Sequence, residues 1–255
     1  MNKEDFFKNF KEEDKNEIIN LYDKFNLALE KDITLFSNEF YTPNIWTIFR
    51  DNIKIKDFKI ESYGVFNEAE RKIISFNNLY QIEYPIKVVK IKNKSKFKNL
   101  SHKDYLGSIM SLGIKRNKLG DLIVKDDICY VAAFSDIAEY IASNLNRISN
   151  VSCDVDILEA DEVDIRYEFT EEVINVQSKR LDSIVSKITR KSRSTAEEII
   201  SRGDVLINYS VYRDKSKEVK ENDRITVRKY GKYILGSIIG NSKSGKLKVI
   251  IKKYT

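Results

Sequence analysis

The segment from Arg180 to Leu235 decides the fold of the C-terminal part of the chain, and it reads RLDSIVSKITRKSRSTAEEIISRGDVLINYSVYRDKSKEVKENDRITVRKYGKYIL. It contains the signals of a short helix, a basic serine-rich turn, a second helix that a glycine ends, and a small β-structure rich in Lys and Arg. The apolar residues of the first helix recur at helical spacing and are Leu181, Ile184, Val185 and Ile188. Because these residues share one face, the charged side chains of the helix can form a separate surface.

Positive charge is concentrated in the same part of the chain. Residues 177–255 carry 20 Lys and Arg but only 8 Asp and Glu, a net charge of +12, whereas the whole chain of 255 residues carries +6. The preceding residues are therefore net acidic, at −6. This asymmetry is typical of a protein that binds a polyanion, because a uniform charge would indicate only solubility. We expect the C-terminal part to bind nucleic acid.

The order of these signals resembles the S4 RNA-binding module. The resemblance rests on Arg180-Leu181-Asp182 at the start of the first helix, the basic turn 190–194, Gly203-Asp204-Val205 at the end of the second helix, and Asn222-Asp223 before the strand 225–228. It implies that RNA contacts Arg180, Lys187, Arg190, Lys191, Ser192, Arg193, Ser194, Arg202, Arg228, Lys229, Tyr230 and Lys232. Arg180 has an alternative role, because it can pair with Asp182, and we interpret Asp182 as structural.

Two local features shape this predicted site. Ser194 and Glu197 are interpreted as a capping box, which would direct the backbone N–H groups at the start of the second helix toward the basic turn. A helix N-terminus beside guanidinium groups is an arrangement that binds phosphate. Gly203 is predicted to adopt a positive φ at the end of that helix, so that the chain can reverse into the next strand. The role of this glycine is structural.

Residues 73–165 alternate between strand and helix patterns. The strand-like stretches are 86–91, 121–124, 128–134 and 151–157. Ser101 with Asp104 is predicted to cap one helix, which Gly113 should end in a left-handed conformation, and a second helix opens at Ser135. The order βαββαβ predicts a ferredoxin-like sheet, which is the architecture of the RNA-recognition-motif (RRM) superfold.

The middle domain also resembles a known family, through the motifs 102–107 (HKDYLG), 112–116 (LGIKR) and 119–121 (LGD). They are similar to the central domain of the YlmH family, bacterial proteins that join an RRM-like domain to a C-terminal S4 module. The resemblance implies a non-enzymatic factor that binds rRNA or tRNA on the large ribosomal subunit, in rescue or quality control of stalled translation. A second candidate RNA contact is the basic loop of Lys115, Arg116 and Lys118, which a solvated helix end explains equally well.

The fold class expected from these patterns is α+β, in four parts. Residues 1–72 form a mainly helical segment, in which Asp14 and Glu17 are interpreted as a capping pair and Thr42-Pro43 starts a further helix. The other parts are an RRM-like domain at 73–165, an acidic linker at 166–178, and the S4 domain with a C-terminal β extension at 179–255.

The chain offers little for metal or covalent chemistry. Its 2 cysteines and 1 histidine cannot assemble a disulfide framework or a Cys/His zinc site. His102 has no paired carboxylate or nucleophile in the sequence and is a poor candidate general base. The N-terminus lacks the layout of a signal peptide, and no uncharged apolar run approaches the roughly 18 residues that span a bilayer. We therefore expect a cytoplasmic protein that uses no metal or cofactor.

Two other classes of protein stay open. S4 modules also occur fused to pseudouridine synthases, rRNA methyltransferases and tyrosyl-tRNA synthetases, so an RNA-modifying enzyme is one alternative. Against it, the 9 glycines form no cofactor loop after a strand, and the Arg-Leu-Asp motif at 180–182 is already part of the first S4 helix. The other alternative is an adaptor whose basic face binds an acidic protein.

Overall fold

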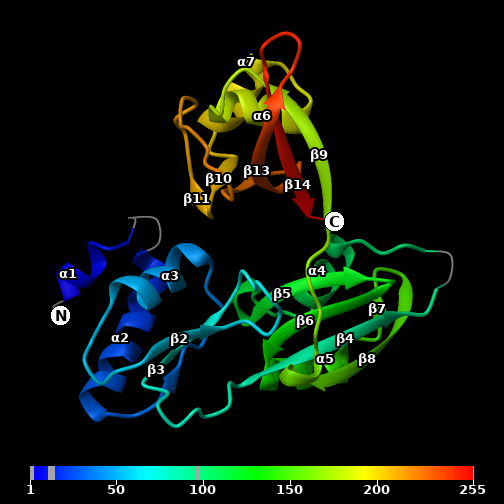
Figure 1. Cartoon of the computed structure of the whole chain (residues 1–255). Helices are drawn as coiled ribbons and strands as arrows, with labels where there is room; N and C mark the ends of the chain where they lie inside the picture. Colours follow the sequence, from blue (N-terminus) through cyan, green and yellow to red (C-terminus); the bar gives the residue numbers. More distant parts are fainter. Residues whose placement is uncertain (1–2, 11–14, 96–97, 255) are drawn as a thin grey trace. The chain divides into compact units, whose positions relative to one another are not determined.

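The structure is a computed structural model that describes residues 3–10, 15–95 and 98–254 (Figure 1). Its fold is α+β, as predicted. The chain divides into two compact units, Met1–Arg166 and Tyr167–Thr255. The predicted cap at Asp14 lies outside the described residues. Within the described ranges, none of the helices has the length and apolar character needed to cross a membrane.

The N-terminal part of the first unit combines helices with a small sheet. Its elements are α1 (Lys3–Phe7), α2 (Lys15–Lys31), β1 (Leu35–Phe36), α3 (Pro43–Asn52), β2 (Ile60–Tyr63) and β3 (Ile73–Phe76), with the strand order β1-β3-β2. Pro43 is the first residue of α3 and follows the extended Thr42, as predicted. Aromatic side chains join the helices to the sheet. The ring centroid of Phe25 in α2 lies 5.7 Å from that of Phe76 in β3 and 6.3 Å from that of Phe49 in α3.

The rest of the first unit is the predicted βαββαβ domain. Its elements are β4 (Ile86–Asn93), α4 (His102–Met110), the 3-10 helix η2 (Arg116–Lys118), β5 (Leu119–Lys125), β6 (Ile128–Phe134), α5 (Ser135–Asn144), β7 (Arg147–Ile148), β8 (Val151–Glu159) and η3 (Ala160–Glu162). The strand order β5-β6-β4-β8-β7 is antiparallel throughout and is that of a ferredoxin-like sheet with one short added strand. Tyr105 of α4 and Ile141 of α5 share one core with Ile91 of β4, so both helices cover the same face.

Two predicted boundaries of α4 are confirmed. The backbone N and the Oγ of Ser101 donate to Oδ2 of Asp104 at 2.8 and 2.6 Å. Gly113, which follows the helix, has a φ of +85°. Both signals are local, because the residues that form each turn lie within four positions of one another.

The motif at Gly120 and Asp121 joins the sheet to the N-terminal part of the unit. A Cβ on Gly120 would lie 2.8 Å from the Phe40 ring, so only glycine lets that ring approach the strand. The buried carboxylate of Asp121 accepts hydrogen bonds from the backbone N of Glu70 at 2.5 Å and of Arg71 at 3.2 Å. Gly120 and Asp121 of the motif at 119–121 therefore stabilise the packing within the first unit.

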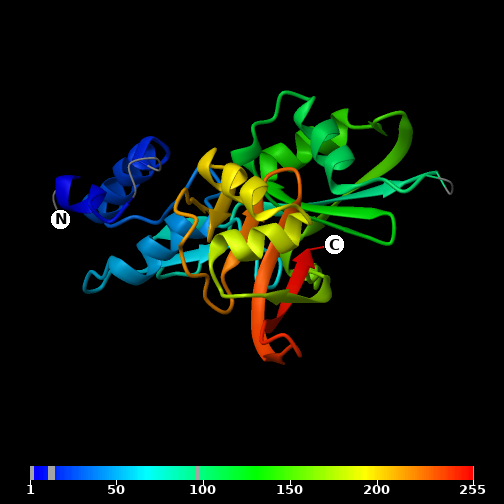
Figure 2. The same ribbon diagram turned by 90° about the horizontal axis from the view of Figure 1, so that it is seen from above.

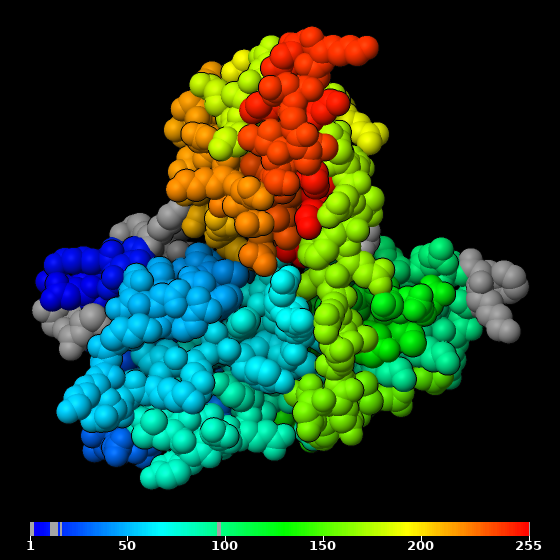
Figure 3. Space-filling view, in the orientation of Figure 1, coloured from blue at the N-terminus to red at the C-terminus, as the bar shows by residue number. Residues whose placement is uncertain are grey.

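The second unit has the two helices and the small β-structure that the sequence predicted, with an extended sheet. Its elements are β9 (Phe169–Val176), α6 (Leu181–Thr189), α7 (Arg193–Ser201), β10 (Val205–Ile207), β11 (Ser210–Val211), β12 (Arg224–Val227), β13 (Gly231–Asn241) and β14 (Leu247–Tyr254). The antiparallel strand order is β11-β10-β12-β13-β14-β9. Ile184 of α6 and Ile199 of α7 share one core with Leu235 of β13, so both helices cover one face of this sheet (Figure 2). The hairpin of β13 and β14, orange to red, lies at the surface of this unit (Figure 3).

Strand β9 lies in the range that the sequence pattern assigned to a linker. Residues 166–178 contain Phe169–Val176, which forms an edge strand along β14. Charge favours this pairing, because Glu171 stands opposite Lys252 and its Oε1 lies 3.1 Å from the lysine Nζ. The acidic residues thus complement a lysine-rich strand. The domain boundaries at 72, 165 and 178 stay predictions.

Candidate nucleic-acid interface

The predicted basic turn joins α6 to α7. Arg190 ends α6 in the left-handed conformation, with φ +56° and ψ +35°, and its side chain is 84% exposed. A residue with a Cβ is disfavoured there by about 1 kcal/mol or more, and glycine is the usual choice. Its Nη2 lies 4.0 Å from Oε2 of Glu172 in β9, and RNA contact by this exposed arginine stays a prediction.

Helix α7 starts directly after this turn. It begins at Arg193, and Ser192 is its N-cap, because Oγ of Ser192 accepts a hydrogen bond from the N–H of Thr195 at 3.2 Å. The predicted capping box of Ser194 and Glu197 is therefore wrong by two residues. Only Lys191 lies between Arg190, the C-cap of α6, and Ser192, so the first serine of the basic turn becomes the cap. The helix N-terminus and the basic turn are nevertheless adjacent, as the prediction required.

Asp182 holds two of the arginines that are expected to bind RNA. Its side chain is fully buried at the start of α6, and its Oδ2 accepts hydrogen bonds from Nη2 of Arg193 at 2.7 Å and from Nη2 of Arg180 at 2.9 Å. The side chains of Arg193 and Arg180 stay 51% and 39% exposed. One buried carboxylate thus orients two guanidinium groups at the surface, where their other N–H groups can donate to phosphate oxygens.

The pKa of Asp182 reflects this arrangement. Burial raises the pKa, but the hydrogen bonds from Arg180 and Arg193, together with their positive charges, outweigh burial and bring the pKa below its ordinary value. The carboxylate is therefore ionised at neutral pH. Since its oxygens are occupied by the two arginines and by the N–H of Ser183 at 2.7 Å, it anchors cations and is not placed as a general base.

A second aspartate repeats this pattern beyond the other end of α7. Oδ2 of Asp204 lies 3.2 Å from Nε of Arg202, and its Oδ1 lies 3.7 Å from Nη1 of Arg228. Since α7 has 9 residues, roughly 13 Å of helix separates the two arginine pairs. The role of Asp204 was missed by sequence reasoning. The signal that could have identified it is the Arg-x-Asp spacing, which occurs at both 180–182 and 202–204.

Three lysines of the predicted set lie outside these pairs. Lys187, Lys191 and Lys229 are exposed, and within the described residues no ion pair engages any of them. Lys191 directly follows Arg190, so the turn presents two adjacent cations. We call the surface made by Arg180, Arg190, Lys191 and Arg193 the basic corner. The two predicted serines, Ser192 and Ser194, lie at the start of α7, and their Oγ atoms are 2.9 Å apart.

Two other predicted residues lie apart from the basic corner. Tyr230 is partly buried against the core of the second unit. Lys232 precedes the core residue Tyr233 along β13, so its side chain points to the sheet face opposite the helices. There its Nζ lies 5.1 Å from the ring centroids of both Tyr209 and Tyr254. The structure therefore does not bring Lys232 together with the basic corner.

The second candidate RNA contact contains side chains with structural roles. Nη1 of Arg116 donates to the carbonyl oxygens of Leu119 and Gly120 at 2.8 and 2.9 Å. Nζ of Lys118 donates to the carbonyl oxygen of Asn38 at 2.7 Å. Lys115 is exposed. RNA contact by Lys115, Arg116 and Lys118 stays a prediction, and two of the three also stabilise the first unit.

The described residues offer little for metal or thiol chemistry. Among the residues that the structure describes, no group of three or more His, Cys, Asp or Glu side chains is placed to hold a metal ion. Cys129 and Cys153 are buried, and burial raises the pKa of both thiols, which disfavours the reactive thiolate. His102 is the first residue of α4.

The fold and the cationic surface define an RNA-binding protein of the S4 class with a ferredoxin-like domain ahead of the S4 module. Two family models agree with this assignment. Residues 80–162 match the family described as "Putative RNA-binding domain in YlmH", and residues 179–225 match the S4 domain. Together these matches span about half of the chain. These matches support the YlmH family as the family of this chain.

Two known proteins resemble the chain over most of their length. "Ribosome-associated protein quality control protein P2" of Bacillus subtilis is 24% identical over 197 residues, which are 74% of this chain and 76% of that protein. The solved structure "Cell division protein ylmH from Streptococcus pneumoniae" matches with a TM-score of 0.50 at 18% identity, over 61% of this chain and 97% of that chain. The second likeness shows a shared fold.

Proposed function

We propose that this protein is a non-enzymatic RNA-binding factor that associates with the large ribosomal subunit and acts in quality control of stalled translation. In this proposal the basic corner contacts the phosphates of rRNA or tRNA. The observation that carries it is the buried Asp182 with Arg180 and Arg193, beside the exposed Arg190. Such phosphate contacts position a protein on RNA, while the choice of RNA depends on shape and on further contacts.

Two observations support the biological setting and the absence of catalysis. The Bacillus subtilis relative is named as a ribosome-associated quality control protein. The carboxylate nearest to the basic corner, Asp182, is locked between two arginines, so it is poorly placed to move a proton. An RNA-modifying enzyme would need an additional reactive group at the surface where RNA binds.

Ultraviolet crosslinking in cells, followed by sequencing of the bound RNA, tests this proposal. We expect footprints on large-subunit rRNA and on tRNA, and we expect them to disappear in a double variant, Arg190→Glu with Lys191→Glu. A footprint limited to one site whose nucleotide is chemically modified would favour the enzyme. Recovery of an acidic protein without RNA would favour the adaptor.

A further inference from the structure

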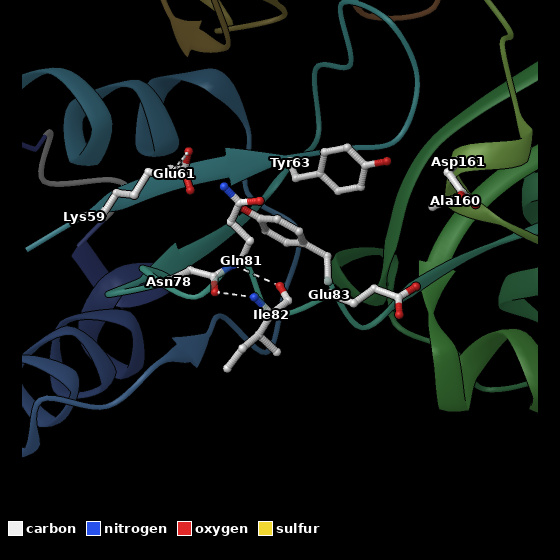
Figure 4. A pocket seen from close by; sticks show the side chains of 10 residues that line it. Lys59, Glu61, Tyr63, Asn78, Gln81, Ile82, Glu83, Ala160 and Asp161 are labelled. Carbon is white, nitrogen blue, oxygen red and sulfur yellow. Dashed lines mark hydrogen bonds and ion pairs between the residues drawn. The ribbon is translucent and has the colours of Figure 1, made fainter.

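A pocket of about 400 Å³ opens in the first unit between β2, the loop that joins β3 to β4, and η3 (Figure 4). Its lining includes the carboxylates of Glu61, Glu83 and Asp161. Lys59 also lines the pocket, but its Nζ lies 3.0 Å from Oε1 of Glu61. Within the described part of the chain, Glu83 and Asp161 form no ion pair. The pocket therefore carries negative charge that the protein does not neutralise by direct contact.

Two tyrosines give this pocket an aromatic wall. The ring centroids of Tyr63 and Tyr84 are 4.9 Å apart, with an angle of 39° between the ring planes. The hydroxyl of Tyr84 is held 3.0 Å from Oγ of Ser75. In Figure 4 the Tyr63 side chain extends from β2 toward Asp161. Aromatic faces and carboxylates both attract a cation, so the lining fits a guanidinium or ammonium group and disfavours a phosphate.

The loop beside the pocket exposes apolar side chains on a fixed backbone. Leu79, Tyr80 and Ile82 are 50%, 88% and 50% exposed. Asn78 is 2% exposed, and its side chain closes the loop by donating from Nδ2 to the carbonyl of Ile82 at 2.9 Å and accepting from the N–H of Ile82 at 2.8 Å (Figure 4). Apolar side chains that are displayed on a pre-ordered loop are suited to a protein interface, because little conformational entropy is lost on binding.

We propose that this acidic pocket and the loop tip 79–82 form a docking site for a basic protein segment. One Arg or Lys side chain of the segment enters the pocket between Tyr63, Glu83 and Asp161, and neighbouring apolar residues of the segment cover the loop tip. Charge complementarity selects this partner, because the free carboxylates would repel the backbone of a nucleic acid. The inference goes beyond the proposed function, since RNA binding by the second unit does not require it.

An NMR titration of the isotope-labelled full chain with a capped Gly-Leu-Arg-Leu-Gly peptide tests the site. We expect saturable shifts of the backbone amides of Tyr63, Asp161 and residues 78–83. A second peptide carries citrulline in place of arginine, which keeps the shape and removes the charge. It should bind about fivefold more weakly, because a cation–π contact and an ion pair are both lost. The double variant Glu83→Gln with Asp161→Asn should weaken binding of the arginine peptide by a similar factor.

The matched control is Glu139→Gln, an exposed carboxylate of α5 in the same unit. It should leave the affinity of the arginine peptide unchanged, and the spectra of all variants report whether they are folded. The proposal is wrong if millimolar arginine peptide causes no saturable shift at the pocket, or if the citrulline peptide binds equally well. Shifts of the same amides by a short single-stranded RNA, in place of the peptide, would also overturn it.

Discussion

Oδ2 of Asp182 accepts a hydrogen bond from Nη2 of Arg193 at 2.7 Å, and this contact ties the first helix of the S4 module to the second. Arg193 is therefore both a candidate RNA ligand and a structural residue. Replacing it by glutamate would place a second carboxylate against the buried one, so stability and binding would change together. Substitutions at the exposed Arg190 and Lys191 avoid this conflict.

The lowered pKa of Asp182 predicts that acid weakens the second unit. A carboxyl group whose folded pKa lies below its unfolded value stabilises the fold above the unfolded pKa, and the contribution is lost as the pH falls through the folded pKa. The free energy of unfolding should therefore decline below about pH 5, and it should decline less in Asp182→Asn. Urea titrations at several pH values measure both slopes. Identical slopes would show that Asp182 does not anchor the arginines.

Arg190→Gly should separate binding from stability. Glycine adopts a φ of +56° without strain, so the free energy of unfolding should stay within about 1 kcal/mol of the parent value. The affinity for RNA should fall, and the slope of log K against log salt should become shallower by about 0.7 to 0.9, because one phosphate contact is lost. Filter binding over a range of salt measures this slope.

The control for this prediction is Lys243→Gly, in the turn between β13 and β14. It removes the same charge from the same unit and should leave the salt slope unchanged. If both variants change the slope equally, net charge and not the basic corner determines binding.

Gly203→Val tests the end of α7. Gly203 has the predicted positive φ, at +79°, and a Cβ there would lie 3.0 Å from Nη2 of Arg213 and 3.3 Å from Cγ1 of Val211. We expect a loss of more than about 1 kcal/mol in the free energy of unfolding. Gly107→Ala is the control, since it lies inside α4 with no atom within 4 Å of the added Cβ, and it should be neutral or stabilising. If the Gly203→Val variant is as stable as the parent, a side chain at this positive φ does not strain the backbone.

RNA should be chemically unchanged after incubation with the protein, with or without S-adenosylmethionine or nucleoside triphosphates. The reason is that the carboxylates nearest to the surface that we propose for RNA face its arginines. Asp182 holds Arg180 and Arg193, and Oε2 of Glu172 lies 4.0 Å from Nη2 of Arg190. Mass spectrometry of rRNA and tRNA nucleosides measures the outcome. A stoichiometric mass change or an isomerised uridine that a single carboxylate or His102 substitution abolishes would establish an enzyme.

Sequence patterns predicted the features that depend on neighbours along the chain. The cap at Ser101, the left-handed Gly113 and Gly203, and the βαββαβ order of the middle domain all belong to this class. The strand β9 was not predicted, because its stability depends on β14, a partner distant in the sequence. The start of α7 was misplaced because several neighbouring hydroxyl residues compete as caps.

The candidate site also combines features that are visible in the sequence with contacts that form only in the folded chain. Charge counting found the cations of the S4 module, since clustering is visible in sequence. It did not show that Asp182 and Asp204 each hold two arginines, because the contacts to Arg193 and Arg228 form only when α6, α7 and β12 pack together. It also could not show that β-sheet pleating turns Lys232 to the opposite face.

In the proposed function, the basic corner binds RNA of the large ribosomal subunit. Cosedimentation with purified large subunits measures this binding for the parent protein and for the Arg190→Glu and Lys191→Glu double variant. We expect the parent protein to pellet with the subunits, while the double variant stays in the supernatant with an unchanged thermal transition, since both side chains are exposed. Equal pelleting of a folded double variant would show that the basic corner does not bind the subunit.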